Sequence, residues 1–103
     1  MLKPHEITKL RGLLKREDDR LPIVFGALGD ANRCRIFRGF LTRDRLCVSD
    51  VARTFGISMS LASQHLKVLE ITKLVVRERE GRSVYYRPNS EDELVRSIIK
   101  AVQ

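Results

Sequence analysis

The chain has 103 residues and a net charge of +7, because 20 lysines and arginines outnumber 13 aspartates and glutamates. A chain of this length forms one domain, and none of its apolar runs is long enough to span a bilayer. The positive charge favours a polyanionic partner, with nucleic acid ahead of an acidic membrane surface. Charged residues interrupt the N-terminal segment, so it lacks the apolar region of a signal peptide. The two cysteines lack the spacing of a disulfide framework, which fits a reducing compartment, so we expect a cytoplasmic protein.

Residues 4–19 predict the first amphipathic helix. Pro4 suits a first-turn position, and the charged run 16–20 is expected to form the solvated end of the helix. An apolar stripe recurs at helical spacing along this segment, formed by Ile7, Leu10, Leu13 and Leu14. Such a stripe on a terminal helix predicts an interface with another subunit.

Two shorter helices are expected next. The first covers residues 21–28 and ends at Gly29, and the second covers residues 31–42 with Asp30 as its N-cap. The run 46–48 is short and β-prone, so it predicts an edge strand beside a later hairpin.

The stretch 49–72 predicts a helix-turn-helix. A helix over 49–55 is followed by Gly56, which suits a left-handed turn, and Ser58 caps the next helix. That second helix turns an apolar face inward and a polar face outward; the polar face carries Ser60, Ser63, Gln64 and Lys67. Short polar side chains and a cation can read base edges and phosphates in a major groove.

After Lys73 the apolar period changes from helical to extended. Strands are predicted over 74–79 and 83–87, joined by a two-residue turn at Glu80 and Gly81. Arg79 and Arg82 flank the tip, where they can reach phosphates or a minor groove. A hairpin directly after a recognition helix is a wing, here residues 74–87. A competing interpretation is that the charges only protect the hairpin from edge aggregation.

The last helix is predicted to begin near Ser90, which forms a capping box with Glu93. Its broad apolar stripe consists of Leu94, Val95, Ile98, Ile99 and Val102. The segments 1–20 and 90–103 therefore predict a homodimer interface. The expected fold is mainly α with a small β-hairpin: one winged helix-turn-helix domain over residues 1–103.

Four segments together resemble the ArsR/SmtB family of winged-helix repressors, namely 27–33, 46–52, 57–69 and 80–86. The resemblance covers residues 24–87 well and the end helices loosely. It implies a homodimeric, autoregulatory repressor that binds a pseudo-palindromic operator on double-stranded DNA and leaves when a ligand binds. Met59 and Leu61 stand where members often have polar residues. Leu61 therefore joins Ser58 and the polar face as a predicted DNA contact, suited to a thymine methyl.

The residues that members use to bind metals are incomplete in this chain. Many members have a Cys-x-Cys pair, but here Ser49 stands at the position of the second cysteine, two residues after Cys47, and its hydroxyl is a poor ligand for a soft metal. The helix after residue 90 lacks the histidines that the other family site uses. We expect no metal and no cofactor. A mixed site of His5 and Cys47 across a dimer would have only two soft ligands.

The cysteines leave two interpretations open. Cys34 and Cys47 are expected to be packed thiols, with a thiol-responsive repressor that uses Cys47 as the alternative. A Cys34–Cys47 disulfide would depend on the separation of their Cα atoms. His65, next to an inward leucine, is expected to make a structural hydrogen bond, with a phosphate contact or a pH-sensitive role as the alternative.

The predicted function is sequence-specific DNA binding by a transcriptional repressor that an unidentified signal releases. A winged-helix protein-interaction module is the rival, and it would show no salt-dependent DNA binding. No Ser/His/Asp, metal or Gly-rich nucleotide motif is present, so no enzymatic activity is expected.

Overall fold

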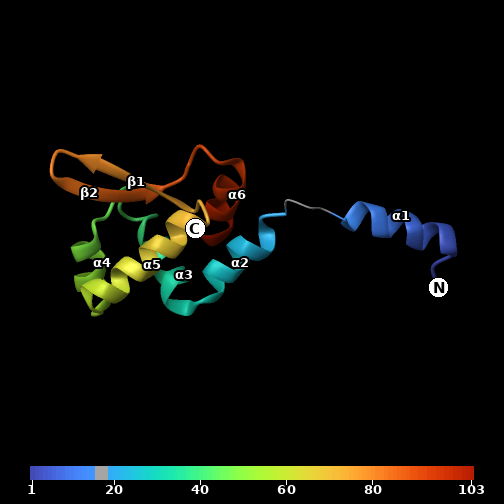
Figure 1. Ribbon diagram of the computed structural model, residues 1–103, viewed down its shortest axis with the longest axis horizontal. Helices are drawn as coiled ribbons and strands as arrows, with labels where there is room; N and C mark the ends of the chain where they lie inside the picture. Colours follow the sequence, from blue (N-terminus) through green and yellow to red (C-terminus); the bar gives the residue numbers. More distant parts are fainter. Residues whose placement is uncertain (16–18) are drawn as a thin grey trace.

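The computed structural model describes residues 1–15 and 19–103, which form six helices and one antiparallel hairpin (Figure 1). In chain order these elements are α1 (Pro4–Leu14), α2 (Leu21–Gly29), α3 (Ala31–Gly39), α4 (Val48–Phe55), α5 (Met59–Ile71), β1 (Val75–Glu80), β2 (Ser83–Pro88) and α6 (Glu93–Val102). The prediction of a mainly helical domain with one small hairpin is confirmed.

The five helices from α2 through α6 and the hairpin share one hydrophobic core. Its largest fully buried side chains include Phe37, Phe40, Ile36, Leu66 and Leu69. Leu74 and Val75 continue this core where the chain passes from α5 into the hairpin. The core thus fixes the recognition helix and the base of the wing in one rigid body.

Helix α1 stands apart from this body, at one end of a molecule that measures 59 × 25 × 23 Å (Figure 1). None of its residues is buried, and Leu13 and Leu14 are 65% and 73% exposed. The helix ends at Leu14, so the predicted extension to residue 19 is wrong. Lys15 leaves the helix with extended backbone, and the Asp19 side chain instead accepts a hydrogen bond from Leu21 N. Residues 16–18 of the predicted solvated end lie outside the described residues.

Two other predicted helix ends are also wrong. Helix α3 stops at Gly39 rather than residue 42, because the next residues form i→i−3 hydrogen bonds: Phe40 N, Leu41 N and Thr42 N donate to the carbonyls of Phe37, Arg38 and Gly39. Helix α6 is capped by Asp92, whose carboxylate accepts a hydrogen bond from Val95 N at 3.2 Å. Ser90 instead lies in the turn after β2, where its N–H donates to the carbonyl of Pro88.

The hairpin register moves the predicted turn by one residue. Glu80 pairs with Ser83, so the turn residues are Gly81 and Arg82 rather than Glu80 and Gly81. Gly81 has a φ of 62°, the left-handed conformation that glycine adopts without steric cost. Leu46 forms an isolated antiparallel bridge with Tyr86, which confirms the predicted edge pairing at this residue alone. The predicted strand over 46–48 is otherwise wrong, because Cys47 is the N-cap of α4 and Val48 its first residue.

Within residues 1–15 and 19–103, no helix combines the length and the apolar character that a membrane crossing requires.

Candidate nucleic-acid interface

The turn between α4 and α5 has the geometry that the sequence predicts. Gly56 adopts φ 63° and ψ 38°, and Ile57 N donates to the Ala52 carbonyl at 3.0 Å. Ser58 caps α5, because its hydroxyl oxygen accepts a hydrogen bond from Leu61 N at 3.0 Å. The oxygen of Ser58 is thus engaged at the cap, while its O–H remains able to donate to a phosphate.

Helix α5 separates into a buried face and an exposed face. Ala62, Leu66 and Leu69 are fully buried in the core. The opposite face is exposed and carries the predicted DNA contacts Ser60, Leu61, Ser63, Gln64 and Lys67. A helix whose inner face is locked into the core presents its outer face rigidly, as recognition in a major groove requires.

His65 belongs to the buried face of α5, with only 7% of its surface exposed. It lies near Asp30, the N-cap of α3. The backbone N–H of Arg33 donates to the Asp30 carboxylate at 3.0 Å and lowers the pKa of that carboxyl. His65 is therefore a core residue in this fold; the hydrogen bond predicted for its ring stays a prediction.

The wing sorts its charges between two faces. Glu78 forms an ion pair with Arg87, and Glu80 forms one with Arg45. Because side chains alternate along a strand, Arg77 and Arg79 point to the other face, and both are exposed. Neither makes an ion pair with a carboxylate of the described residues.

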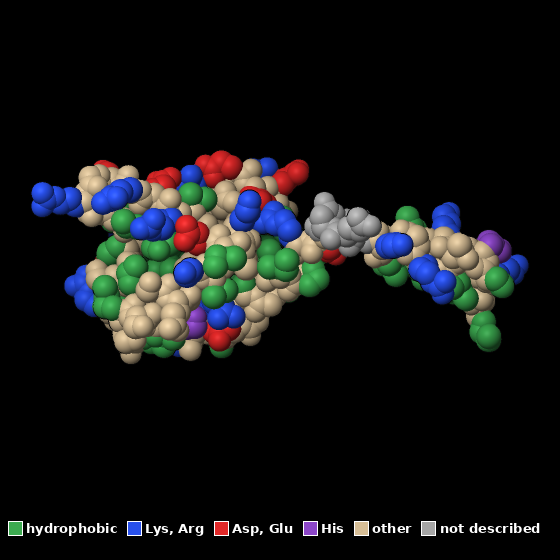
Figure 2. Space-filling model, in the orientation of Figure 1, with side chains coloured by type: hydrophobic (Ala, Val, Ile, Leu, Met, Phe, Trp, Pro, Cys, Tyr) green, Lys and Arg blue, Asp and Glu red, His purple; other side chains and the backbone are tan. Residues whose placement is uncertain are grey.

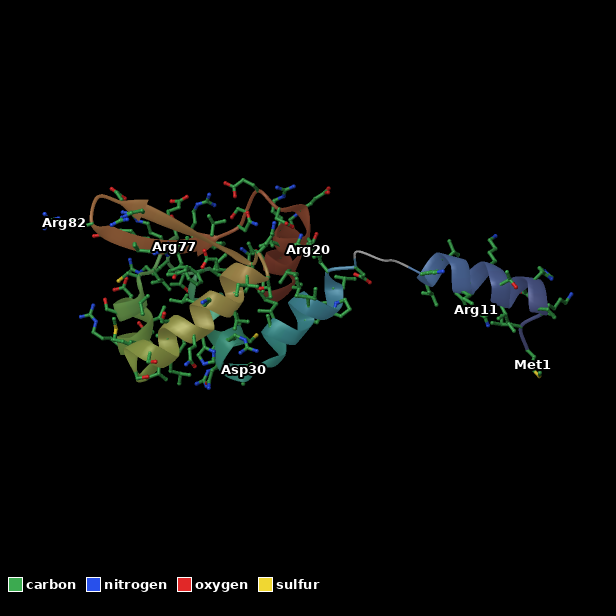
Figure 3. All side chains as sticks on the ribbon, in the orientation of Figure 1. Met1, Arg11, Arg20, Asp30, Arg77 and Arg82 are labelled. Atoms are coloured by element: carbon green, nitrogen blue, oxygen red, sulfur yellow. The ribbon has the colours of Figure 1, made fainter. Side chains whose placement is uncertain are left out.

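Arg82 completes a group of three exposed cations, which we call the wing arginines: Arg77, Arg79 and Arg82. Arg82 lies in the turn and projects beyond the tip of the hairpin (Figure 3). The space-filling view shows Lys and Arg side chains along this end of the hairpin, one of them standing out beyond its tip (Figure 2). Arg79 and Arg82 are predicted from the sequence as DNA contacts and Arg77 is not, although its position two residues before Arg79 places it on the same face.

The segment before α4 is tied to the wing. The guanidinium of Arg45 lies 4.1 Å from the centre of the Tyr85 ring and also pairs with Glu80, which raises the pKa of Arg45. Beside it, Leu46 and Tyr86 exchange two backbone hydrogen bonds of 3.0 and 2.8 Å. These contacts hold the wing in a fixed position relative to the helix-turn-helix.

The two cysteines are both free thiols and half-buried. Cys47 occupies the N-cap of α4, where its N–H donates to the Asp50 carboxylate at 3.0 Å and lowers the pKa of that carboxyl. Its Sγ lies 3.1 Å from Ser49 Oγ. Cys34 lies on α3, a different element of the body. The contacts described for Cys47 are those of a helix cap.

The described part of the chain contains no cluster of three or more His, Cys, Asp or Glu side chains that could hold a metal ion. His5 lies on α1, which extends away from the body that contains Cys47 (Figure 1). The protomer itself does not bring these two residues together.

A recognition helix with an open polar face, a left-handed glycine turn and a wing with exposed arginines define a winged helix-turn-helix DNA-binding domain. Comparisons with known proteins agree with this class. Residues 28–78 match a family model described as a helix-turn-helix domain. The chain is 32% identical to a cadmium resistance transcriptional regulatory protein CadC homologue of Staphylococcus aureus. This match extends over 90 residues, 87% of this chain and 73% of that protein.

Two further comparisons concern a repressor and a solved structure. A transcriptional repressor SmtB homologue of Synechocystis is 42% identical over 62 residues, which are 60% of this chain and 46% of that protein. The match thus spans less than half the length of that relative. A homodimeric winged helix-turn-helix domain of Mycobacterium bovis, described as a possible ArsR-family regulator, superposes with a TM-score of 0.70. It is 28% identical and covers 86% of this chain and 85% of that one.

The chain belongs to the ArsR/SmtB family of winged helix-turn-helix transcriptional repressors. The resemblance found in the sequence is confirmed.

Proposed function

We propose that this protein is a transcriptional repressor that binds a pseudo-palindromic operator as a homodimer. The observation that carries the proposal is the position of the recognition face and the wing. The start of α5 and the tip of the hairpin lie at the same end of the molecule, opposite α1 (Figure 1). Both are exposed, and each carries groups that suit a groove or a phosphate.

The two sets of contacts would divide the work of binding. Ser60, Leu61, Ser63, Gln64 and Lys67, with Ser58 at the cap, would set sequence preference and register in the major groove. The wing arginines would supply phosphate affinity without reading sequence. A protein that acts on the operator of its own gene works where that DNA is, so we place it in the cytoplasm.

The homodimer is supported by the unpaired apolar stripe of α1, with Leu13 and Leu14 the most exposed members. In contrast, α6 buries Val95 and Ile98 in its own protomer, so it has less apolar surface left for a partner. Exposed apolar groups on α2, led by Ile23 at 60%, add surface that the sequence analysis did not assign. The interface would therefore consist of α1 and the remaining apolar surface of α6, the two predicted dimerisation helices, with the exposed face of α2 adding to it.

Selection from a pool of random DNA duplexes tests the proposal directly. The expected product is a two-fold symmetric sequence whose half-sites lie one helical turn apart, about 34–36 Å. Enrichment of an asymmetric site, or no enrichment at low salt, would contradict it and favour the protein-interaction module. Binding to DNA from upstream of the gene that encodes this chain then tests autoregulation.

A further inference from the structure

A pocket on another side of the body is unused by the DNA-binding proposal. It lies between α3, α4 and α6 and has a volume of about 460 Å³, within the range of small-molecule sites. Its lining includes Arg35, Arg38, Leu41, Thr42, Phe55 and Val102. Gly39 and Gln103 complete the lining, and none of these lining side chains from the described part of the chain is acidic.

The walls of the pocket combine positive charge with apolar surface. Arg35 and Arg38 stand one helical turn apart on α3, so both guanidinium groups can reach the same ligand. Neither forms an ion pair with another residue of the described chain. Leu41, Phe55 and Val102 are half-buried and supply the apolar part.

We propose that this pocket binds a small organic carboxylate with an apolar body, and that this ligand is the signal that weakens operator binding. Guanidinium groups match carboxylates in charge and in the geometry of paired hydrogen bonds. The half-buried walls favour an apolar body behind that carboxylate, while a cationic ligand would be repelled. The regulatory part rests on the proposed function; the binding part does not.

The position of the pocket explains how a ligand there could act on DNA binding. Phe55 is the last residue of α4, directly before the Gly56 turn that leads to the recognition helix. A Cβ built on Gly39 would lie 3.7 Å from Phe55 Cζ, so α3 and α4 are in contact beside the pocket. Val102, on α6, also lines the pocket. A ligand that contacts both Phe55 and Val102 would contact the helix-turn-helix and the last helix at the same time.

A ligand can shift a conformational equilibrium only by its difference in affinity for the two states. The carboxylate must therefore bind more tightly to the conformation in which α4 is placed as in the DNA-free protein than to the DNA-bound conformation. By linkage, operator DNA then weakens ligand binding by the same factor that the ligand weakens DNA binding.

The binding test uses 2-naphthoate and its neutral counterpart 2-naphthamide, titrated into ¹⁵N-labelled full chain without DNA. We expect 2-naphthoate to shift the amide signals of Gly39, Leu41 and Phe55. Loss of charge-assisted hydrogen bonds should weaken binding about tenfold or more, both for 2-naphthamide and for the double variant R35Q/R38Q. The double variant R77Q/R82Q removes the same charge from the wing and should bind 2-naphthoate like wild type.

The regulatory test measures affinity for the selected duplex by fluorescence anisotropy. Saturating 2-naphthoate should weaken operator binding by wild type about tenfold and leave R35Q/R38Q unaffected. Absence of shifts at the pocket, or equal binding by R35Q/R38Q, overturns the site while operator binding still supports the repressor. Binding at the pocket without any change in operator affinity overturns the regulatory part. Ligand binding without any DNA binding overturns the proposed function and, with it, the signal.

Discussion

The wing arginines allow a quantitative test of how this protein holds DNA. Each released counterion contributes a slope of about −0.9 to the plot of log affinity against log salt concentration. In a homodimer every wing arginine occurs twice, so replacing one should reduce the slope by about 1.8. Replacing Arg77, Arg79 and Arg82 together should reduce it by about 5.

The assay is fluorescence anisotropy with the selected duplex between 50 and 200 mM NaCl, roughly the range over which the loss of affinity caused by several phosphate contacts is large enough to measure. Over that fourfold change in salt, six phosphate contacts correspond to about three decades of affinity. Arg96→Gln is the matched control for a single wing replacement, because it removes one charge from α6, where the hydrogen bonds of Arg96 within the described chain go to the backbone carbonyls of Ser90 and Glu91.

The triple variant also separates affinity from specificity. Its binding to selected and random duplexes should fall by a similar factor, because phosphate contacts carry no sequence information. A triple variant whose salt slope equals that of wild type would refute the assignment of these arginines to phosphates. Loss of specificity with an unchanged slope would instead indicate that the wing reads bases.

Four other results are expected. Gln64→Ala should cost about 1–3 kcal/mol on the selected duplex and little on random DNA, so equal losses in titrations of both would remove Gln64 from base reading. Asp92→Ala should lower the free energy of unfolding in urea by about 1–3 kcal/mol, since it removes the α6 cap and the 2.7 Å bond from Arg20. Ser90→Ala is its control and should change that energy by less than about 0.5 kcal/mol. Burial raises the pKa of the Asp92 carboxyl, but the hydrogen bonds from Arg20 and from the Val95 N–H lower it, and the net result is a pKa below the ordinary value. Its stabilising effect is therefore present above the unfolded pKa of about 3.9 and is lost as the pH falls below it, so urea curves for wild type and Asp92→Ala should converge in acid. Mild oxidant separates the two interpretations of Cys47: a packed thiol predicts unchanged operator affinity, whereas an oxidant-induced loss that Cys47→Ser abolishes would establish the thiol-responsive alternative.

Local chemistry made the helix-turn-helix predictable from the sequence. Gly56 and Ser58 determine the turn through their own backbone and side-chain properties, and the apolar spacing of α5 determines its inner face. These signals act over a few residues and need no knowledge of the rest of the chain. The same holds for the hairpin, whose existence follows from alternation and one glycine, here Gly81.

The errors occurred where two local solutions compete and distant contacts decide. Ser90 and Asp92 are both good N-caps, but Asp92 is also held by Arg20, a residue 72 positions earlier in the chain. The pairing of Glu80 with Arg45 likewise joins the wing to a segment that no periodicity connects with it. The ion pairs of Glu78 and Glu80 therefore became visible only in the fold, whereas strand alternation in the sequence already places Arg77 on the face of Arg79.

The isolated position of α1 links its folding to the symmetry of DNA recognition. A helix of 11 residues with no buried side chain, interrupted by Gly12, is marginally stable in water. Packing against a second subunit would remove its apolar stripe from water and stabilise the helix at the same time. The same association provides the second recognition helix that a two-fold symmetric operator requires. Under the proposed dimer, the event that orders α1 is thus also the event that creates the complete DNA-binding surface, and both depend on protein concentration through the same equilibrium.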